Sequence, residues 1–206
     1  MNRKEHWEHV YRTKAPTEVS WYQGRPTRSM ELLDELGIEP ETRVIDVGGG
    51  DSTLVDALLE RHVAQVTVLD LSAAALDGAK VRLGVRAAEV QWVVADVTAV
   101  ELTTNSFDIW HDRAVFHFLV DEADRRRYVA QAARSIRPGG ALVIGTFALD
   151  GPTRCSSLDV VRYSPETLAF ELGDDFEFCR SVADIHKTPG GAEQSFTFAL
   201  LRRRRV

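Results

Sequence analysis

The sequence has little cysteine, because Cys155 and Cys179 are its only thiols among 206 residues. Two cysteines so far apart exclude a disulfide framework and a Cys-x-x-Cys site, and no metal is expected. The chain also lacks an apolar run of about 20 residues, the length that a membrane-spanning helix needs. Its first residues, Met1 to Trp7, contain no apolar core of a secretory signal. These absences predict a cytoplasmic protein with no membrane partner.

An excess of positive charge is missing as well. The 25 Lys and Arg residues stand against 31 Asp and Glu, which gives a formal net charge of −6. A general nucleic-acid binder needs a basic face that displaces counterions from phosphates, so no nucleic-acid partner is expected. The basic run Arg202 to Arg205 is interpreted as a solvated tail.

What the sequence does contain is an alternation of short apolar strands and amphipathic helices from Arg43 onwards. The predicted strands are 43–47, 66–69, 90–94, 107–110 and 141–147, and the predicted helices between them are 52–61, 72–83 and 121–136. This alternation predicts βαβ units and a doubly wound, Rossmann-like α/β sheet with helices on both faces. After a helix at 164–172, the turn Thr188-Pro-Gly-Gly separates two strand-like segments, 176–186 and 194–202. An antiparallel hairpin is therefore predicted to close the sheet.

The chain is predicted to be one domain. Residues 1–38, with helices at 2–13 and 27–37, form an N-terminal cap on a core of residues 39–206. Trp21 and Tyr22 lie in a segment bounded by Pro16 and Pro26 that has no helical or strand period. This segment is predicted to be a lid over a site.

The loop after the first predicted strand, Asp46-Val-Gly-Gly-Gly50, is the first motif that points to chemistry. Glycines here allow a ligand to touch backbone N–H groups at a helix N-terminus. The dinucleotide fingerprint G-x-G-x-x-G/A requires a small third residue where Thr53 stands, so it fits poorly. Asp46 is also an unfavourable neighbour for a pyrophosphate. An acid at this position favours a ligand with a cationic end.

Acids follow the next two predicted strands. Asp70 ends the second strand, where a carboxylate is suited to accept two hydrogen bonds from a ribose diol. The alternative is that Asp70 only precedes the helix that Ser72 caps. Asp96 and Val97 end the third strand, where a carboxylate and the next N–H are suited to an adenine ring. The alternative there is a loop aspartate.

Together these motifs resemble the class I S-adenosylmethionine-dependent methyltransferases over about residues 40–147. Asp46-Val-Gly-Gly-Gly50 matches the family motif D-x-G-x-G-x-G through its second glycine, with Ser52 in place of the third. The resemblance implies a sheet order of 3-2-1-4-5-7-6 with strand seven antiparallel, and S-adenosylmethionine as cofactor. The residues it implies around the cofactor are Asp46, Gly48, Gly49, Gly50, Asp70, Leu71, Asp96, Val97, His111, Trp21 and Tyr22.

Methyl transfer is an in-line attack on a sulfonium methyl, so alignment and exclusion of water matter most. A base is needed only where the acceptor must first lose a proton. His111 and His117 are the candidate bases, because both follow the fourth strand and histidine titrates near neutral pH. Core packing is the alternative for His117. The predicted substrate contacts are Arg113, Arg154, Cys155 and Tyr163, where Arg113 either binds an anionic acceptor or pairs with Asp112.

These features predict an enzyme, a methyltransferase acting on a small-molecule acceptor, because 206 residues leave little beyond the cofactor domain for docking a macromolecule. Two alternatives stay open. One is a protein or peptide methyltransferase of the lysine type. The other is a non-catalytic nucleotide-binding module that keeps the fold.

Overall fold

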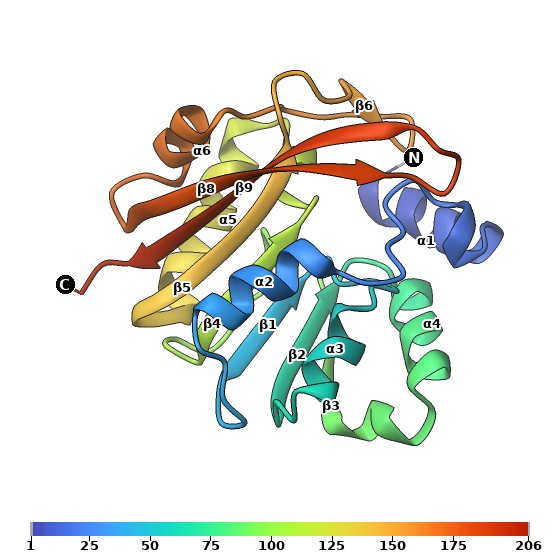
Figure 1. The fold of residues 1–206 in the computed structure, drawn as a ribbon, viewed down its shortest axis with the longest axis horizontal. Helices are drawn as coiled ribbons and strands as arrows, with labels where there is room; N and C mark the ends of the chain where they lie inside the picture. Colours follow the sequence, from blue (N-terminus) through green and yellow to red (C-terminus); the bar gives the residue numbers. More distant parts are fainter. Residues whose placement is uncertain (1, 206) are drawn as a thin grey trace.

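A twisted seven-stranded sheet forms the centre of the computed structural model, which describes residues 2–205 (Figure 1). The sheet order is β3-β2-β1-β4-β5-β9-β8. β9 is antiparallel to both of its neighbours, and the other pairs are parallel. The strands are β1 (Arg43–Val47), β2 (Gln65–Asp70), β3 (Val90–Val94), β4 (Phe107–Arg113), β5 (Ile136–Phe147), β8 (Phe176–Lys187) and β9 (Glu193–Arg203).

Two further strands, β6 (Arg154–Cys155) and β7 (Leu158–Asp159), form a separate two-stranded sheet. Counted without them, the main sheet has the predicted order 3-2-1-4-5-7-6, with its seventh strand antiparallel. The doubly wound α/β fold is therefore confirmed.

Helices cover both faces of this sheet, with α2 in front of it and α5 behind it in Figure 1. Alternate strand residues enter two hydrophobic clusters, so that Val44 faces one and Ile45 faces the other. The first cluster includes side chains of α2 (Thr27–Glu35), α3 (Leu54–Glu60) and α4 (Ala73–Leu83). The second includes side chains of α5 (Glu122–Ser135) and α6 (Pro165–Leu172).

The N-terminal segment lies beside the carboxyl ends of the central strands (Figure 1). It consists of α1 (Arg3–Thr13) and the single turn η1 (Pro16–Glu18), before α2. Two more single-turn or short 3₁₀ helices, η2 (Gly84–Glu89) and η3 (Phe116–Phe118), follow α4 and β4. No helix within residues 2–205 is both long and apolar enough to cross a membrane.

Local sequence signals explain most element starts. The Ser72 hydroxyl accepts a hydrogen bond from the Ala75 N–H at 3.2 Å and caps α4, as predicted. Ser164 caps α6 in the same way, with Pro165 in the first turn. β4 continues to Arg113, beyond the predicted end at 110, because its last residues pair with both β1 and β5.

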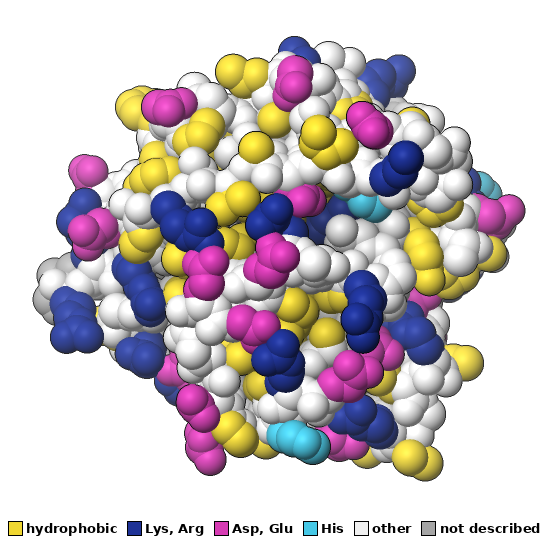
Figure 2. All heavy atoms as spheres, in the orientation of Figure 1, with side chains coloured by type: hydrophobic (Ala, Val, Ile, Leu, Met, Phe, Trp, Pro, Cys, Tyr) yellow, Lys and Arg dark blue, Asp and Glu magenta, His cyan; other side chains and the backbone are white. Residues whose placement is uncertain are grey.

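The basic run at the C-terminus is not the solvated tail that was expected. Arg202 and Arg203 belong to β9, where they pair with Glu177 and Phe176 of β8. The Arg204 N–H donates to the carbonyl of Asp175 at 2.9 Å. On the face shown in Figure 2, acidic side chains lie among the basic ones.

Candidate functional site

Two adjoining cavities lie at the carboxyl ends of β1, β2 and β4. The first, of about 800 Å³ including its mouth, extends along the ends of β2 and β3. The second, of about 950 Å³ including its mouth, extends over the glycine loop toward α2. Tyr11, Trp21, Gly48 and Arg113 line both cavities and separate them. The two cavities therefore meet at the glycine loop.

The glycine loop depends on backbone conformations that favour glycine. Gly48 and Gly50 have φ values of +66° and +48°. A Cβ at Gly48 would lie 1.9 Å from Cγ2 of Val115, and one at Gly50 would lie 2.8 Å from the Tyr11 hydroxyl. Both neighbours come from distant segments that close onto the loop. Glycine is therefore required here for close packing as well as for φ.

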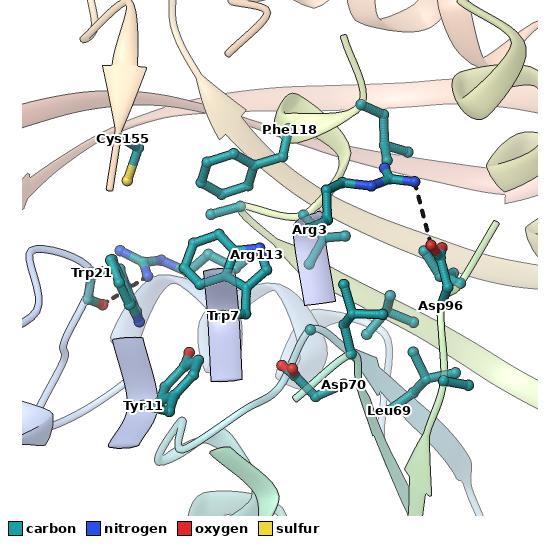
Figure 3. A pocket seen from close by; sticks show the side chains of 18 residues that line it. Arg3, Trp7, Tyr11, Trp21, Leu69, Asp70, Asp96, Arg113, Phe118 and Cys155 are labelled. Atoms are coloured by element: carbon teal, nitrogen blue, oxygen red, sulfur yellow. Dashed lines mark hydrogen bonds and ion pairs between the residues drawn. The ribbon is translucent and has the colours of Figure 1, made fainter. Parts of the chain in front are cut away.

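Asp70 is a buried acid in the wall of the first cavity (Figure 3). Its Oδ1 accepts a hydrogen bond from the Ser72 N–H at 2.8 Å. Burial, together with the charge of Asp46, raises the pKa of Asp70 to about 7, although backbone N–H donors oppose the rise. A carboxylate held in this way binds best to a ligand that donates hydrogen bonds or carries positive charge.

Asp96 lies further along the same cavity, next to Val97. Its Oδ1 accepts from the Thr98 N–H at 2.8 Å and from the Thr98 hydroxyl at 2.7 Å. Its Oδ2 faces Arg3 of α1, whose Nη2 lies 3.3 Å away (Figure 3). α1 therefore reaches across the end of this cavity.

Asp46 is held by a buried chain of polar groups in the second cavity. The His111 Nδ1 lies 2.7 Å from Asp46 Oδ1, and its Nε2 lies 2.8 Å from the Ser29 hydroxyl. All three residues are at most 2% exposed. An ionised carboxylate only accepts, so Nδ1 donates to Asp46 and a neutral ring accepts from Ser29 at Nε2. These hydrogen bonds fix the orientation of the Asp46 carboxylate.

Aromatic side chains close the first cavity from the N-terminal side (Figure 3). Trp7 of α1 makes edge contacts with Trp21 and Phe118, with ring centroids 5.5 Å and 5.1 Å apart. Tyr11, one turn further along α1, contacts Trp21 as well. Glu8 anchors the helix, because its carboxylate accepts from the Ala73 N–H at the start of α4 at 2.7 Å.

Arg113 does not pair with Asp112, which was one of the two expectations for it. The Asp112 carboxylate accepts from the N–H groups of Val115 and Phe116 and from the Tyr128 hydroxyl. The Arg113 side chain instead donates from Nη1 to the carbonyl of Trp21 at 3.1 Å (Figure 3).

Most of the predicted site residues line these cavities. Asp70, Leu71, Asp96, Val97 and Cys155 line the first, Asp46, Gly49, Tyr22 and His111 line the second, and Gly48, Trp21 and Arg113 line both. Gly50 lies directly beneath Tyr11. The cofactor roles implied for these residues stay predictions.

Three further predicted residues lie outside both linings, as Gly50 does. His117 is fully buried, its Nδ1 accepts from the Phe147 N–H at 3.2 Å, and burial with the charge of Arg113 lowers its pKa to about 3. Tyr163 is buried in the second hydrophobic cluster against Phe116. Arg154 is exposed and pairs with Asp159 at 3.0 Å. The structure therefore does not bring these three residues together with the cavity walls.

Ser29, Arg3 and Phe118 also line the cavities and were not among the predicted site residues. Ser29 had a signal, because it precedes the inward-facing Leu32 and Leu33 by three and four residues, which places it on the same helix face. Arg3 and Phe118 had none. Their positions depend on contacts with segments far away in the chain.

Residues 44–140 match the family model of a methyltransferase domain. A nodulation protein S from Rhizobium tropici is 30% identical over 122 residues, which cover 59% of this chain and 50% of that protein. The ubiquinone/menaquinone biosynthesis C-methyltransferase UbiE from Dinoroseobacter shibae is 31% identical over 121 residues, which cover 57% of this chain and 47% of that protein.

An eEF1A lysine and N-terminal methyltransferase from Danio rerio is 25% identical over 147 residues, which cover 70% of this chain and 21% of that protein. The chain thus spans half or less of the length of these curated relatives. Among solved structures, the N-methyltransferase NodS from Bradyrhizobium japonicum, in complex with S-adenosyl-L-homocysteine, matches with a TM-score of 0.73 at 17% identity. That match covers 99% of this chain and 100% of the other, and it shows a shared fold.

Proposed function

Because the chain belongs to the class I S-adenosylmethionine-dependent methyltransferases, we propose that it transfers a methyl group from S-adenosylmethionine to a small-molecule acceptor. One observation carries this proposal. Asp46, Asp70 and Asp96 lie at or just beyond the carboxyl ends of three neighbouring strands, and all three line the two adjoining cavities.

The chemistry of these donors fits S-adenosylmethionine. The fixed carboxylate of Asp46 suits the ammonium group of its amino-acid end, and Asp70 suits the two ribose hydroxyls. Asp96 and the N–H of Val97 suit the amine and a ring nitrogen of adenine. Two buried acids beside the glycine loop are, by contrast, unfavourable for a pyrophosphate, so the same set fits a nicotinamide dinucleotide poorly.

S-adenosylmethionine supplies, when bound, an electrophilic methyl group on a positively charged sulfur. The residues of this chain bind and orient the cofactor and the acceptor, and they exclude water from the site. His111 acts in this proposal as a positioning residue, because it holds the Asp46 carboxylate in one orientation. Trp7 and Trp21 cover the first cavity, and a dry site favours a reaction in which positive charge is lost from sulfur. The role of His111 or His117 as a general base stays a prediction.

The covering of the first cavity supports a small acceptor. Trp7 of α1 and Trp21 of the following connection line this cavity, so the N-terminal segment narrows the space that a macromolecular acceptor would need. The name of the UbiE relative, a methyltransferase of ubiquinone/menaquinone biosynthesis, supports the same class. The eEF1A-directed relative favours a protein acceptor instead, so peptides belong in the test.

Calorimetry with S-adenosylhomocysteine, NAD and NADP tests the cofactor. We expect S-adenosylhomocysteine to bind, and Asp46→Asn to weaken its binding at least about tenfold, the factor that corresponds to 1.4 kcal/mol. Asp121→Asn, a change of the same kind at the start of α5, is the matched control. Binding of NAD in place of S-adenosylhomocysteine would overturn the proposal.

Release of S-adenosylhomocysteine from S-adenosylmethionine then tests the acceptor. Small phenols, quinols and amines are compared with lysine-containing peptides at equal concentration. Turnover with a small molecule and none with the peptides is the expected result. Turnover with peptides alone would favour the protein methyltransferase alternative.

A further inference from the structure

Arg113 carries a charge that the described residues leave without an anionic partner. Its Nε and Nη2 atoms are buried and have no hydrogen-bond partner within residues 2–205. The carboxylates whose charge acts on it, Asp184 and Asp46, contact Arg28 and His111 instead. A buried charge without a partner is costly, so it is normally paired or meets a ligand.

The two free nitrogen atoms form one edge of the guanidinium group. Nη1 points the other way and is already used by the carbonyl of Trp21. The Nε–Nη2 edge is one of the two edges with which arginine binds a carboxylate through two parallel hydrogen bonds. The contact with Trp21 therefore occupies Nη1, and the edge suited to a carboxylate has no hydrogen-bond partner among the described residues.

The surroundings of Arg113 are apolar and aromatic. Its guanidinium carbon lies 4.8 Å from the centroid of the Phe196 ring. Trp21 and Phe118 line the same end of the first cavity, together with Cys155 (Figure 3). The walls thus suit an acceptor with a flat apolar body as well as an anionic group.

Arg113 lies on the side of the cleft away from the proposed adenosine site. Its backbone pairs with Gly145 of β5, and Phe196 belongs to β9. Asp70 ends β2 and Asp96 follows β3, on the opposite side of β1 in the sheet. In Figure 3 the guanidinium lies toward Trp21 and Cys155, away from Asp96. Arg113 is therefore separated by β1 from the residues proposed to bind adenosine.

We infer that the methyl acceptor is a small molecule with a carboxylate, or a similar planar anion, on an apolar ring-sized body, and that Arg113 binds this anion. The inference rests on the proposed function for the identity of the ligand as an acceptor. It names the class of acceptor and makes Arg113 a residue that determines specificity.

Pairs of carboxylates and their primary amides test the inference without knowledge of the natural acceptor. The probes are benzoate and benzamide, phenylacetate and phenylacetamide, and indole-3-acetate and its amide. Each is titrated into the wild-type protein, with and without saturating S-adenosylhomocysteine, by ligand-observed NMR or calorimetry. We expect at least one carboxylate to bind about tenfold more tightly than its amide, because only the carboxylate offers two charged acceptor atoms.

Variants then assign the preference to Arg113. In Arg113→Gln the preference falls below about twofold while the affinity for S-adenosylhomocysteine stays within about threefold, and Arg113→Lys keeps part of the preference as a point charge. Arg126→Gln removes the same charge from the exposed face of α5 and leaves the preference unchanged. Melting curves show whether each variant is folded. If Arg113→Gln does not fold, the inference is still tested by comparing each carboxylate with its amide in the wild-type protein and in Arg113→Lys.

Three results would overturn the inference. The first is that no carboxylate binds better than its amide, and the second is that the preference survives in Arg113→Gln. The third is a loss of S-adenosylhomocysteine affinity of about tenfold or more in that variant, which would assign Arg113 to the carboxylate of the cofactor. Failure of the wild-type protein to bind S-adenosylhomocysteine counts against the proposed function alone, because the probe pairs are also measured without it.

Discussion

The surroundings of Asp70 disfavour its own negative charge, and its place in the cavity wall lets a ligand reach it. The side chain is 7% exposed, and its pKa of about 7 lies far above the ordinary 3.8. That difference corresponds to roughly 4 kcal/mol against the ionised form in the folded protein, at 1.36 kcal/mol for each pKa unit. An acid kept at this cost in a cavity wall is typical of a binding site rather than of a core.

We therefore expect Asp70→Asn to stabilise the ligand-free protein and to weaken the binding of S-adenosylhomocysteine. At pH 8 the free energy of unfolding should rise by about 2–4 kcal/mol, because the buried charge is removed. The affinity for S-adenosylhomocysteine should fall at least about tenfold, because charge-assisted hydrogen bonds to the ribose are lost. Urea unfolding and calorimetry measure the two effects.

The control is the pH dependence of the difference in unfolding free energy between Asp70→Asn and wild type. The folded-state pKa of Asp70 is raised, so the folded protein binds more protons than the unfolded chain between about pH 4 and 7. The stability contributed by the neutral acid is present below that window and is lost as the pH rises through it. The gap between Asp70→Asn and wild type should be smaller at pH 5 than at pH 8 by roughly 2 kcal/mol. Equal gaps would contradict the raised pKa.

The chain from Ser29 through His111 to Asp46 gives a second prediction. Ser29→Ala removes the partner of a buried ring nitrogen, which should lower the free energy of unfolding by about 1–3 kcal/mol. It should also weaken S-adenosylhomocysteine binding by about threefold, because His111 then holds Asp46 less firmly. Thermal and urea unfolding, with calorimetry, check both.

Ser20→Ala is the matched control for that variant, because the Ser20 hydroxyl lies 3.9 Å from the Cys155 sulfur and makes only a weak contact. Its effect on unfolding should stay within about 0.5 kcal/mol. If Ser29→Ala changed the unfolding free energy no more than Ser20→Ala does, the hydrogen bonds from Ser29 through His111 would not be what holds Asp46.

Among single residues, the sequence predicted those whose position follows from a strand end. Asp46 and Asp70 are the fourth residue of β1 and the last of β2, and the loops after those strands necessarily share one edge of a parallel sheet. Arg113 was predicted at that edge too, but its free nitrogen atoms depend on the carbonyl of Trp21, 92 residues earlier. Such partners follow from packing between distant segments, which a single-sequence pattern does not encode.

At the level of elements, the sequence predicted β1 and β3 with their observed bounds, because each is a short apolar run between turns. β5 begins at Ile136, five residues before the predicted start, since Ile136 pairs with Phe107 across an irregularity in the register. The β6–β7 hairpin was not predicted. Each strand has only two residues, and the turn uses Ser156 and Ser157 at positive φ, for which serine carries no signal.

The attachment of α1 to α4 is a property of these two helices together. The Glu8 carboxylate accepts from the Ala73 N–H at 2.7 Å, where unpaired N–H groups and the helix dipole favour negative charge. Glu8→Ala should cost about 1 kcal/mol of unfolding free energy. It should also weaken S-adenosylhomocysteine binding by about threefold, because α1 supplies Trp7 and Tyr11 to the first cavity. Urea unfolding and calorimetry measure these changes.

Lys4→Ala, on the exposed side of α1, is the control and should change neither quantity. Glu8→Gln keeps an acceptor oxygen without the charge and should fall between wild type and Glu8→Ala. If Glu8→Ala matched Lys4→Ala in both measurements, α1 would be held by its other contacts, such as the aromatic ones and the Arg3–Asp96 pair, and not by Glu8.

For the molecule as a whole, the N-terminal segment closes a cleft whose two halves come from different parts of the sheet. β1 and β2 carry Asp46 and Asp70, Asp96 follows β3, and β4, β5 and β9 carry or adjoin Arg113. The segment reaches both halves, because Arg3 pairs with Asp96 and the Trp21 carbonyl accepts from Arg113. A cofactor enclosed in this way must enter and leave past the segment.

We therefore expect the connection between α1 and α2 to open in the ligand-free protein and to close on S-adenosylhomocysteine. Lys14 and Tyr22 lie in this connection, and both line the second cavity. Trypsin should cleave after Lys14, and chymotrypsin after Trp21 or Tyr22, faster in the ligand-free protein, because cleavage requires local opening. Trypsin cleavage after Arg61, in the exposed turn between α3 and β2, is the internal control and should not respond to the ligand. Mass spectrometry of the fragments gives the rate at each bond. Rates at Lys14 and Tyr22 that are equal with and without S-adenosylhomocysteine, under conditions where calorimetry shows binding, would mean that the segment is permanently packed, and the cofactor would then need another way in.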